Sequence, residues 1–386
     1  MDKTALNVTL KKGMPETTAK FLPAMVADPF VFRGDAGNPL LAPRGVWLSN
    51  GRLLVSDTGQ NRVFIWQDVN KILQSNGYVI PDIILGQTNK DATGRNAGKT
   101  VSAGTLQYPS GLWSDGQRLI VADAWNHRVL IWHTFPTQQG QPADVVLGQP
   151  KFTDNQSNVH GVGHAPDVRS LNWCYGVFSD GERLWIADTG NRRILYYHHI
   201  PTENYAAADA VIGKTSFVER DYDYNDAIWP YAVKISPAGH LAITDTQYYR
   251  ILLWRHWQDA FTKKADVIIG QPDFETNGMN QHGLFPQAHT LSWCYDAFFY
   301  KNSLFVADTG NSRVLYYHNL PQQNNAAADN LIGKPHFNMG SENADTIFGT
   351  DRSLYWPFAI SIENGTIALA DTGNHRIMLY KLKKDE

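Results

Sequence analysis

Two cysteines, Cys174 and Cys294, are the residues whose type and surroundings best suit ligand chemistry, and the chain has no others. Both lie in a Trp-Cys-Tyr motif, and both follow a loop of the pattern Asn-x-x-Asn-x-His-Gly. Thiolate and imidazole groups are the usual protein ligands of zinc and related metals. One hypothesis is therefore a metal or metallocofactor site. Its candidate ligands are Cys174, Cys294, His160, His164, His282 and His289.

Aromatic residues accompany both cysteines. Two further segments carry Trp-Pro-aromatic where the cysteine segments carry Trp-Cys-Tyr. Aromatic side chains around an opening offer apolar faces and polar tips, which suit a small molecule or a loop of a partner protein. The candidate ligand-binding residues are Trp173, Cys174, Tyr175, Trp229, Tyr231, Trp293, Cys294, Tyr295, Trp356 and Phe358.

An internal repeat indicates which elements position these residues. An apolar run, an Asp, a short turn and an Arg recur six times, with the Asp always five residues before the Arg. β-Branched and aromatic residues flank a Thr-Gly-Asn type of turn, in which we expect Gly to supply the positive φ, so each copy predicts a β-hairpin. Because every copy has the Asp and the Arg, we expect a structural role for both. The pairs are Asp57 and Arg62, Asp123 and Arg128, Asp188 and Arg193, Asp245 and Arg250, Asp308 and Arg313, and Asp371 and Arg376.

Each hairpin is preceded by a short apolar run after Pro or Cys and followed by one that ends in Gly-Gln or Gly-Lys. Four strands repeated six times predict an all-β, six-bladed propeller with four antiparallel strands per blade. Only five Gly-ending runs exist for six blades. We therefore expect residues 22–30 to form the outer strand of the sixth blade and close the ring. Residues 1–21 are then an N-terminal tail, and residues 22–382 a single domain.

The repeat resembles the NHL-repeat family of β-propellers, and the letters of that name stand at Asn126-His127 and Asn374-His375. The resemblance covers about residues 22–382 and implies the six-bladed fold. It also implies an interaction platform, the commonest use of these propellers. Related six-bladed propellers include metal-dependent lyases, lactonases and the streptogramin lyase. The sequence holds no catalytic set that matches theirs, so the resemblance transfers no catalytic residue.

The repeat gives the cysteines a second interpretation. They occupy the position that is proline in the other four copies, and free cysteine often serves as a small buried apolar residue. In a six-bladed ring, the inner strands of the third and fifth blades are about 14 Å apart, which excludes a disulfide. One zinc bound by both thiolates would also be strained. The sequence leaves the ligand and the buried-residue hypotheses open.

Composition and charge exclude several classes of protein. The 34 basic and 37 acidic residues give a net charge of −3, which argues against nucleic acid as the partner. No stretch approaches the roughly 20 apolar residues of a membrane span, and the first 25 residues contain no apolar signal region, so we expect a cytoplasmic protein. The favoured interpretation is a non-catalytic platform that binds a protein or small molecule at the loop face and channel mouth. A metal or metallocofactor holder and a metal-dependent lyase or hydrolase are the alternatives.

Overall fold

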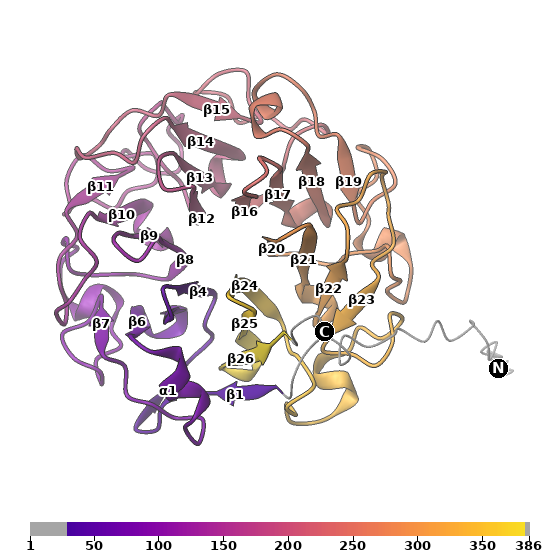
Figure 1. The fold of residues 1–386 in the computed structure, drawn as a ribbon. Coiled ribbons are helices and arrows are strands. Elements are labelled where there is room, and N and C mark those ends of the chain that lie inside the picture. The colour runs from indigo at the N-terminus through magenta and orange to yellow at the C-terminus, as the bar shows by residue number, and fades with distance from the viewer. Residues whose placement is uncertain (1–28, 383–386) are drawn as a thin grey trace, which may run out of the picture.

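The structure, a computed structural model, describes residues 29–382. Six four-stranded antiparallel sheets surround a central axis, as Figure 1 shows. The predicted six-bladed propeller is thereby confirmed. The described residues include no helix with the length and apolar character that crossing a membrane requires.

Each blade runs from an inner strand at the axis to an outer strand at the rim (Figure 1). Blade 1 consists of β4 (Gly45–Ser49), β5 (Arg52–Asp57), β6 (Arg62–Trp66) and β7 (Ile83–Leu85). Blade 2 consists of β8 (Pro109–Ser114), β9 (Leu119–Asp123), β10 (Arg128–Trp132) and β11 (Val145–Leu147). Blade 3 consists of β12 (Cys174–Ser179), β13 (Leu184–Asp188), β14 (Arg193–Tyr197) and β15 (Ala210–Ile212).

The remaining blades repeat the order. Blade 4 consists of β16 (Pro230–Ile235), β17 (Leu241–Asp245), β18 (Arg250–Trp254) and β19 (Val267–Ile269). Blade 5 consists of β20 (Asp296–Tyr300), β21 (Ser303–Asp308), β22 (Arg313–Tyr317) and β23 (Asn330–Ile332). Blade 6 consists of β24 (Pro357–Glu363), β25 (Thr366–Asp371), β26 (Arg376–Lys381) and β1 (Phe30–Phe32).

Short elements connect the strands. A two-stranded ribbon joins β2 (Gly34–Asp35) to β3 (Asn38–Pro39), and one α-helix, α1 (Val69–Leu73), precedes β7. The hairpin turns are the 3-10 segments η2 (Thr58–Gln60), η4 (Ala124–Asn126), η5 (Thr189–Asn191), η6 (Thr246–Tyr248), η9 (Thr309–Asn311) and η11 (Thr372–Asn374). The loops carry η3 (Arg95–Gly98), η7 (Trp257–Phe261), η8 (Met279–His282) and η10 (Glu342–Asp345).

The glycine of the hairpin turn has a different function from the one we expected. The positive φ falls on the residue just before the Arg, such as Asn61 (φ 56°) or His127 (φ 51°), and not on the Gly. The Gly is required by a close approach instead. A Cβ at Gly190 would lie 2.7 Å from the carbonyl oxygen of Asn172, and one at Gly310 would lie 2.8 Å from that of Ser292. The expectation of a left-handed glycine was wrong, because steric space is what this position needs.

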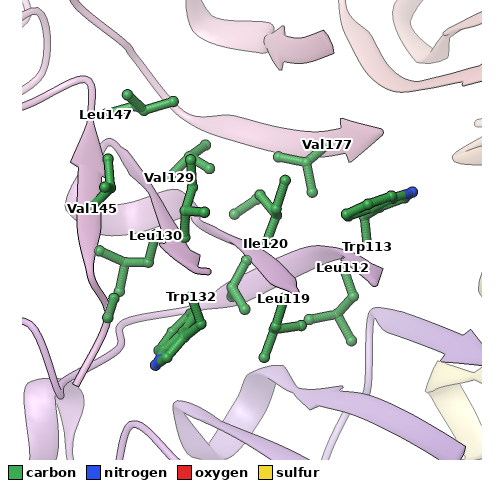
Figure 2. Packing of buried hydrophobic residues seen from close by; sticks show 14 of the residues in the cluster. Leu112, Trp113, Leu119, Ile120, Val129, Leu130, Trp132, Val145, Leu147 and Val177 are labelled. Atoms are coloured by element: carbon green, nitrogen blue, oxygen red, sulfur yellow. The ribbon is translucent and has the colours of Figure 1, made fainter. Parts of the chain in front are cut away.

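The apolar core lies between neighbouring blades. In blade 2, shown in Figure 2, side chains of β8 to β11 pack together and against Val177 of blade 3. In blade 1, Leu54 belongs to the cluster shared with blade 2, whereas Leu53 and Val55 belong to the cluster shared with blade 6. Because every blade shares its core with two neighbours, each blade depends on a closed ring.

Strand β1 closes that ring. It pairs antiparallel with β26, with Phe30 opposite Leu379 and Phe32 opposite Ile377. Phe32 is fully buried and meets Trp66 of blade 1 edge-on, with ring centroids 4.9 Å apart. Closure by an N-terminal strand is thus confirmed, although the strand lies at Phe30–Phe32. Residues 22–28 of the predicted segment, and the predicted boundary at residue 21, lie outside the described residues.

Candidate binding site at the channel mouth

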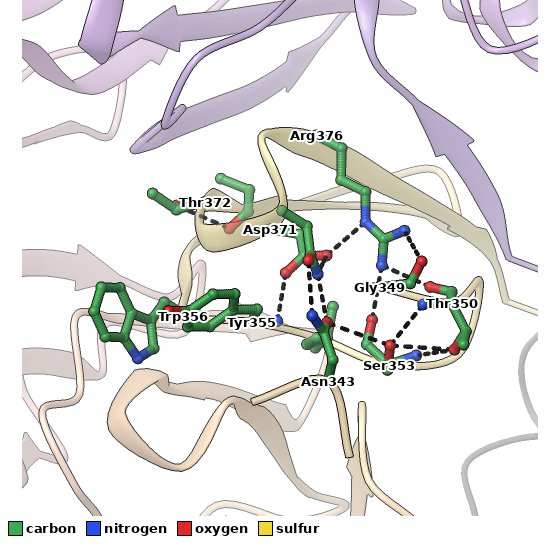
Figure 3. Close-up of polar contacts among 12 residues, drawn as sticks. Asn343, Gly349, Thr350, Ser353, Tyr355, Trp356, Asp371, Thr372 and Arg376 are labelled. Carbon is green, nitrogen blue, oxygen red and sulfur yellow. Dashed lines mark hydrogen bonds and ion pairs between the residues drawn. The ribbon is translucent and has the colours of Figure 1, made fainter. Parts of the chain in front are cut away.

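Buried Asp–Arg pairs hold the loops that lead to the inner strands. In blade 6, shown in Figure 3, Nε of Arg376 donates to Oδ2 of Asp371 at 2.7 Å. Oδ1 of Asp371 accepts the backbone N–H of Tyr355, and the guanidinium also donates to the carbonyl oxygens of Thr350 and Ser353. The same ion pair recurs at 2.7–2.9 Å in every blade. This geometry supports the structural role predicted for the repeated Asp and Arg residues.

A β-bulge interrupts the start of the inner strand in blades 2, 3, 4 and 6. In blade 3, Cys174 pairs with Asp188 and Gly176 with Ala187, which leaves Tyr175 as the extra residue. A bulge bends the strand and re-aims that side chain. Blades 2, 4 and 6 show the same register shift. We call the residues at this position of the repeat the mouth ring: Arg44, Ser110, Tyr175, Tyr231, Tyr295 and Phe358.

Aromatic contacts join one side of the mouth ring. Tyr175 stacks on Tyr231 with ring centroids 4.7 Å apart, and Tyr295 stacks on Phe358 at 4.1 Å. Tyr231 meets Tyr295 edge-on at 4.5 Å. Burial raises the pKa of Tyr175, Tyr231 and Tyr295 above the usual tyrosine value. Their hydroxyls therefore remain neutral hydrogen-bond donors across the physiological pH range.

Arg44 contributes the positive charge of the mouth ring. Its guanidinium carbon lies 4.1 Å from the ring centroid of Phe358 and 5.2 Å from that of Tyr108. Burial raises the pKa of Tyr108 to about 12, so that hydroxyl is neutral as well. The guanidinium is thus held by aromatic faces, through cation–π contacts.

Below the mouth ring the channel is almost filled. The inner strands approach so closely that a Cβ at Gly45 would lie 2.0 Å from the carbonyl oxygen of Ser110. Trp47 lies edge-on to both Phe178 and Phe298, at 6.5 and 6.0 Å. The remaining cavity measures about 30 Å³, which accommodates about two water molecules. An organic ligand can lie across the mouth, but it cannot pass into the channel.

One ion pair lies in the channel wall. Nζ of Lys234 donates to Oδ1 of Asp296 at 2.8 Å, and both side chains are largely buried. Oδ2 of Asp296 accepts the backbone N–H of Ile360 at 2.9 Å. The pair links blades 4, 5 and 6, and the carboxylate is fully engaged by donors.

Exposed tryptophans surround the mouth ring. Trp125, Trp173, Trp293 and Trp356 are 37–44% exposed. Trp173 lies 6.4 Å from the half-buried Trp229, centroid to centroid. We call these five residues the rim tryptophans. Trp173, Trp293 and Trp356 have φ values of 47°, 46° and 52°, a left-handed conformation that is costly for a bulky residue and occurs often at functional sites.

His127 supports one rim tryptophan. Its Nδ1 accepts the backbone N–H of Trp173 at 3.0 Å, and burial lowers the pKa of His127 to about 4. Asn61 accepts the N–H of Tyr108 in the same way in blade 1, so asparagine fits this position.

The His127→Asn variant should therefore keep its stability at pH 7.5 and lose part of the acid sensitivity of the parent protein. Between pH 6.5 and 4, the unfolded chain binds a proton at His127 that the folded protein does not bind, so acidification destabilises the fold by up to about 3 kcal/mol. Urea unfolding at pH 4.5 and 7.5 measures the difference. An unchanged pH dependence in the variant would contradict the assignment.

The two cysteines lie in the wall between blades. Both are fully buried. Sγ of Cys174 donates to the carbonyl oxygen of Arg128 at 3.3 Å, and Sγ of Cys294 to that of Arg250 at 3.4 Å. Burial raises the pKa of both thiols well above the usual value, which opposes the thiolate form that binds metal. This placement favours the buried-residue interpretation over the metal-ligand one.

The four candidate histidines lie in loops, apart from the cysteines. His160 and His164 have ring centroids 5.5 Å apart and are exposed, as is His282, whereas His289 is half-buried. Across residues 29–382, the structure contains no group of three or more His, Cys, Asp or Glu side chains that could hold a metal ion. The structure thus does not bring the two cysteines and the candidate histidines of residues 29–382 together into one ligand group.

The shared loop motif around those histidines has a structural explanation. Oδ1 of Asn158 accepts from Nδ2 of Asn191 at 2.8 Å, and Nδ2 of Asn158 donates in return. Asn280 and Asn311 exchange the same bonds in blade 5. The asparagine of the motif thus ties each loop to its hairpin turn.

The sequence predicted the aromatic members of the mouth ring and most rim tryptophans, but it missed the charged members of the site. Arg44 could have been found, because it follows Pro43 where the other copies place Ser, Tyr or Phe. Lys234 and Asp296 are charged residues within otherwise apolar inner-strand runs. Trp125 occupies the position of the turn glycine in blade 2.

No protein-family model matches this chain, and no curated protein matches it. Among solved structures, it is similar to a structural genomics protein of unknown function from Bacteroides thetaiotaomicron VPI-5482, with a TM-score of 0.52 and 11% identity over 93% of this chain and 76% of that one. An auxiliary nutrient binding protein from the same organism gives a TM-score of 0.52 and 12% identity, over 93% and 77%. A streptogramin B lyase gives 0.47 and 11%, over 92% and 98%. These likenesses show the fold alone.

Proposed function

We propose that this chain is a non-catalytic binding module of the NHL-repeat type, and that its ligand lies across the channel mouth. The observation that carries the proposal is the group of rim tryptophans. Four of the five are more than a third exposed, although tryptophan is usually well buried in a folded protein. Exposed aromatic side chains around one opening are typical of a surface that a ligand or partner covers.

The chemistry of the mouth favours binding over catalysis. Its polar groups are a guanidinium and tyrosine hydroxyls, and burial raises the pKa of those hydroxyls further from neutrality. Efficient general acids and bases have pKa values near the working pH. The ring can therefore hold and orient a ligand, but it offers no group suited to proton transfer at neutral pH.

Fluorine NMR of protein labelled with 5-fluorotryptophan tests the proposal. The probes are small aromatic acids, amines and amides, and the resonances are assigned by single Trp→Phe substitutions. We expect at least one probe class to shift the resonances of Trp173, Trp293 and Trp356. Trp66, Trp132 and Trp185 are buried within the blades and serve as internal controls that should not move.

A Trp173→Ala, Trp293→Ala double variant should bind the same probe at least tenfold more weakly. The matched control is Tyr78→Ala, because Tyr78 is as exposed as Trp173, at 38%, but lies between α1 and β7. The proposal fails if no probe class moves the rim resonances, or if Tyr78→Ala weakens binding as much as the double variant does.

A further inference from the structure

We infer that the mouth selects ligands that carry a carboxylate group, and that Arg44 is the residue that binds it. This inference rests on the proposed binding function and adds the chemical class of the ligand. Among the described residues, Arg44 differs from the repeated arginines in that it has no acidic partner. The six repeated arginines each pair with a buried Asp, whereas within residues 29–382 the Arg44 guanidinium forms no ion pair with an Asp or Glu side chain.

Two buried hydroxyls, those of Tyr231 and Ser110, lie beside the Arg44 guanidinium. Oη of Tyr231 interacts with the Arg44 guanidinium and with Oγ of Ser110, although neither contact has the geometry of a standard hydrogen bond. Tyr231 and Ser110 are 6% and 1% exposed. Both belong to the mouth ring, and the Tyr231 ring also lines the channel cavity. A guanidinium and two hydroxyls therefore converge here, and this guanidinium forms no ion pair with a carboxylate among the described residues.

The charges that line the channel favour an anion. Three charged groups line the cavity: Arg44, Lys234 and Asp296. Lys234 and Asp296 neutralise each other at 2.8 Å, and Asp296 also accepts the N–H of Ile360. The sum of two positive charges and one negative charge is +1, and the uncompensated charge is that of Arg44. A cationic ligand is disfavoured at this position.

Shape favours a carboxylate over a larger anion. The cavity of about 30 Å³ accommodates a planar group with two oxygens, and a guanidinium matches that group with two parallel hydrogen bonds. A tetrahedral phosphate is bulkier, and its oxygens cannot all lie in the plane of the guanidinium. The rest of the ligand would then lie on the rim tryptophans, so an apolar or aromatic group next to the carboxylate should strengthen binding.

Isothermal titration calorimetry with matched probes tests the inference. Phenylacetate and neutral phenylacetamide form one pair. N-acetyl-glycyl-phenylalanine and its C-terminal amide form the second, so the two pairs distinguish a small acid from the end of a peptide. We expect the carboxylate member of at least one pair to bind the parent protein at least tenfold more tightly than its amide.

Three variants test which residue provides the preference for carboxylate over amide. Arg44→Gln should remove the preference for carboxylate, and Tyr231→Phe should weaken carboxylate binding several-fold while the ring stays in place. Arg95→Gln is the matched control, because Arg95 lies over Trp125 on the same face but outside the mouth ring. Circular dichroism confirms folding. If Arg44→Gln fails to fold, Arg44→Lys replaces it and should retain only part of the preference.

The outcomes separate this inference from the proposed function. Equal affinity for carboxylate and amide in the parent protein, or a full preference in Arg44→Gln, overturns the inference and leaves the binding site standing. If none of the four probes binds and the rim resonances stay fixed, the inference and the proposed function both fail.

Discussion

Replacement of Asp188 with alanine is expected to lower the free energy of unfolding by about 3–5 kcal/mol. The carboxylate accepts hydrogen bonds from Arg193, Asn191 and the backbone of Asn172, at 2.7–2.8 Å. Its removal leaves the guanidinium of Arg193, which is fully buried, without a counter-ion. Chemical denaturation monitored by tryptophan fluorescence measures the change.

The chain offers a matched control a few residues away. Asp180 pairs with Arg183 at 2.7 Å, the same distance as in the buried pair, but these side chains are 28% and 32% exposed. Asp180→Ala should cost only about 1 kcal/mol, because exposed ion pairs contribute little. Similar losses in the two variants would show that burial does not determine the contribution of the repeated pair.

Replacement of Phe32 with alanine is expected to lower the free energy of unfolding by about 3–5 kcal/mol, the usual cost of removing a buried phenylalanine side chain. Phe32 is the fully buried residue of β1 and contacts Trp66 in blade 1. It therefore packs the closing strand of blade 6 against the first blade. Thermal and urea unfolding should show one cooperative transition at lower stability.

Phe30→Ala provides the comparison within the same strand. Phe30 is only half-buried, so its truncation should cost clearly less than that of Phe32. If the two variants are equally stable, or if Phe32→Ala is silent, the ring does not depend on the packing of β1.

The fold could be predicted from the sequence because the hairpin motif occurs six times. Six hairpins in one register predict six blades even where a single motif is weak, as in blade 4, whose turn reads Gln247-Tyr248-Tyr249. The closing strand in the described residues is Phe30–Phe32, whereas the sequence prediction put it at residues 22–30. The apolar character of that segment resembles that of β1, and the sequence contains no residue type that fixes the register of a three-residue strand.

The site was only partly predictable, because its geometry depends on a bulge. Simple alternation along the inner strand cannot show that Tyr175 and Tyr231 are extra residues that face the axis, since the register shift resets the alternation. The rarity of cysteine drew attention to Cys174 and Cys294, whereas the structure buries them as small residues. Arg44 was overlooked because charge in a loop is common, and only the ring around it shows that the charge is unpaired.

The pairing of β1 with β26 also determines when the ring can close during synthesis. On a ribosome, residues 30–32 emerge long before their partners at 377–379. Until then, the growing protein has an incomplete last sheet and exposed apolar faces on its two terminal blades, the features that promote aggregation. The pairing also joins residues that are very distant in sequence, and such contacts slow folding. The contact that closes the finished ring can therefore form only after all six blades have been synthesised.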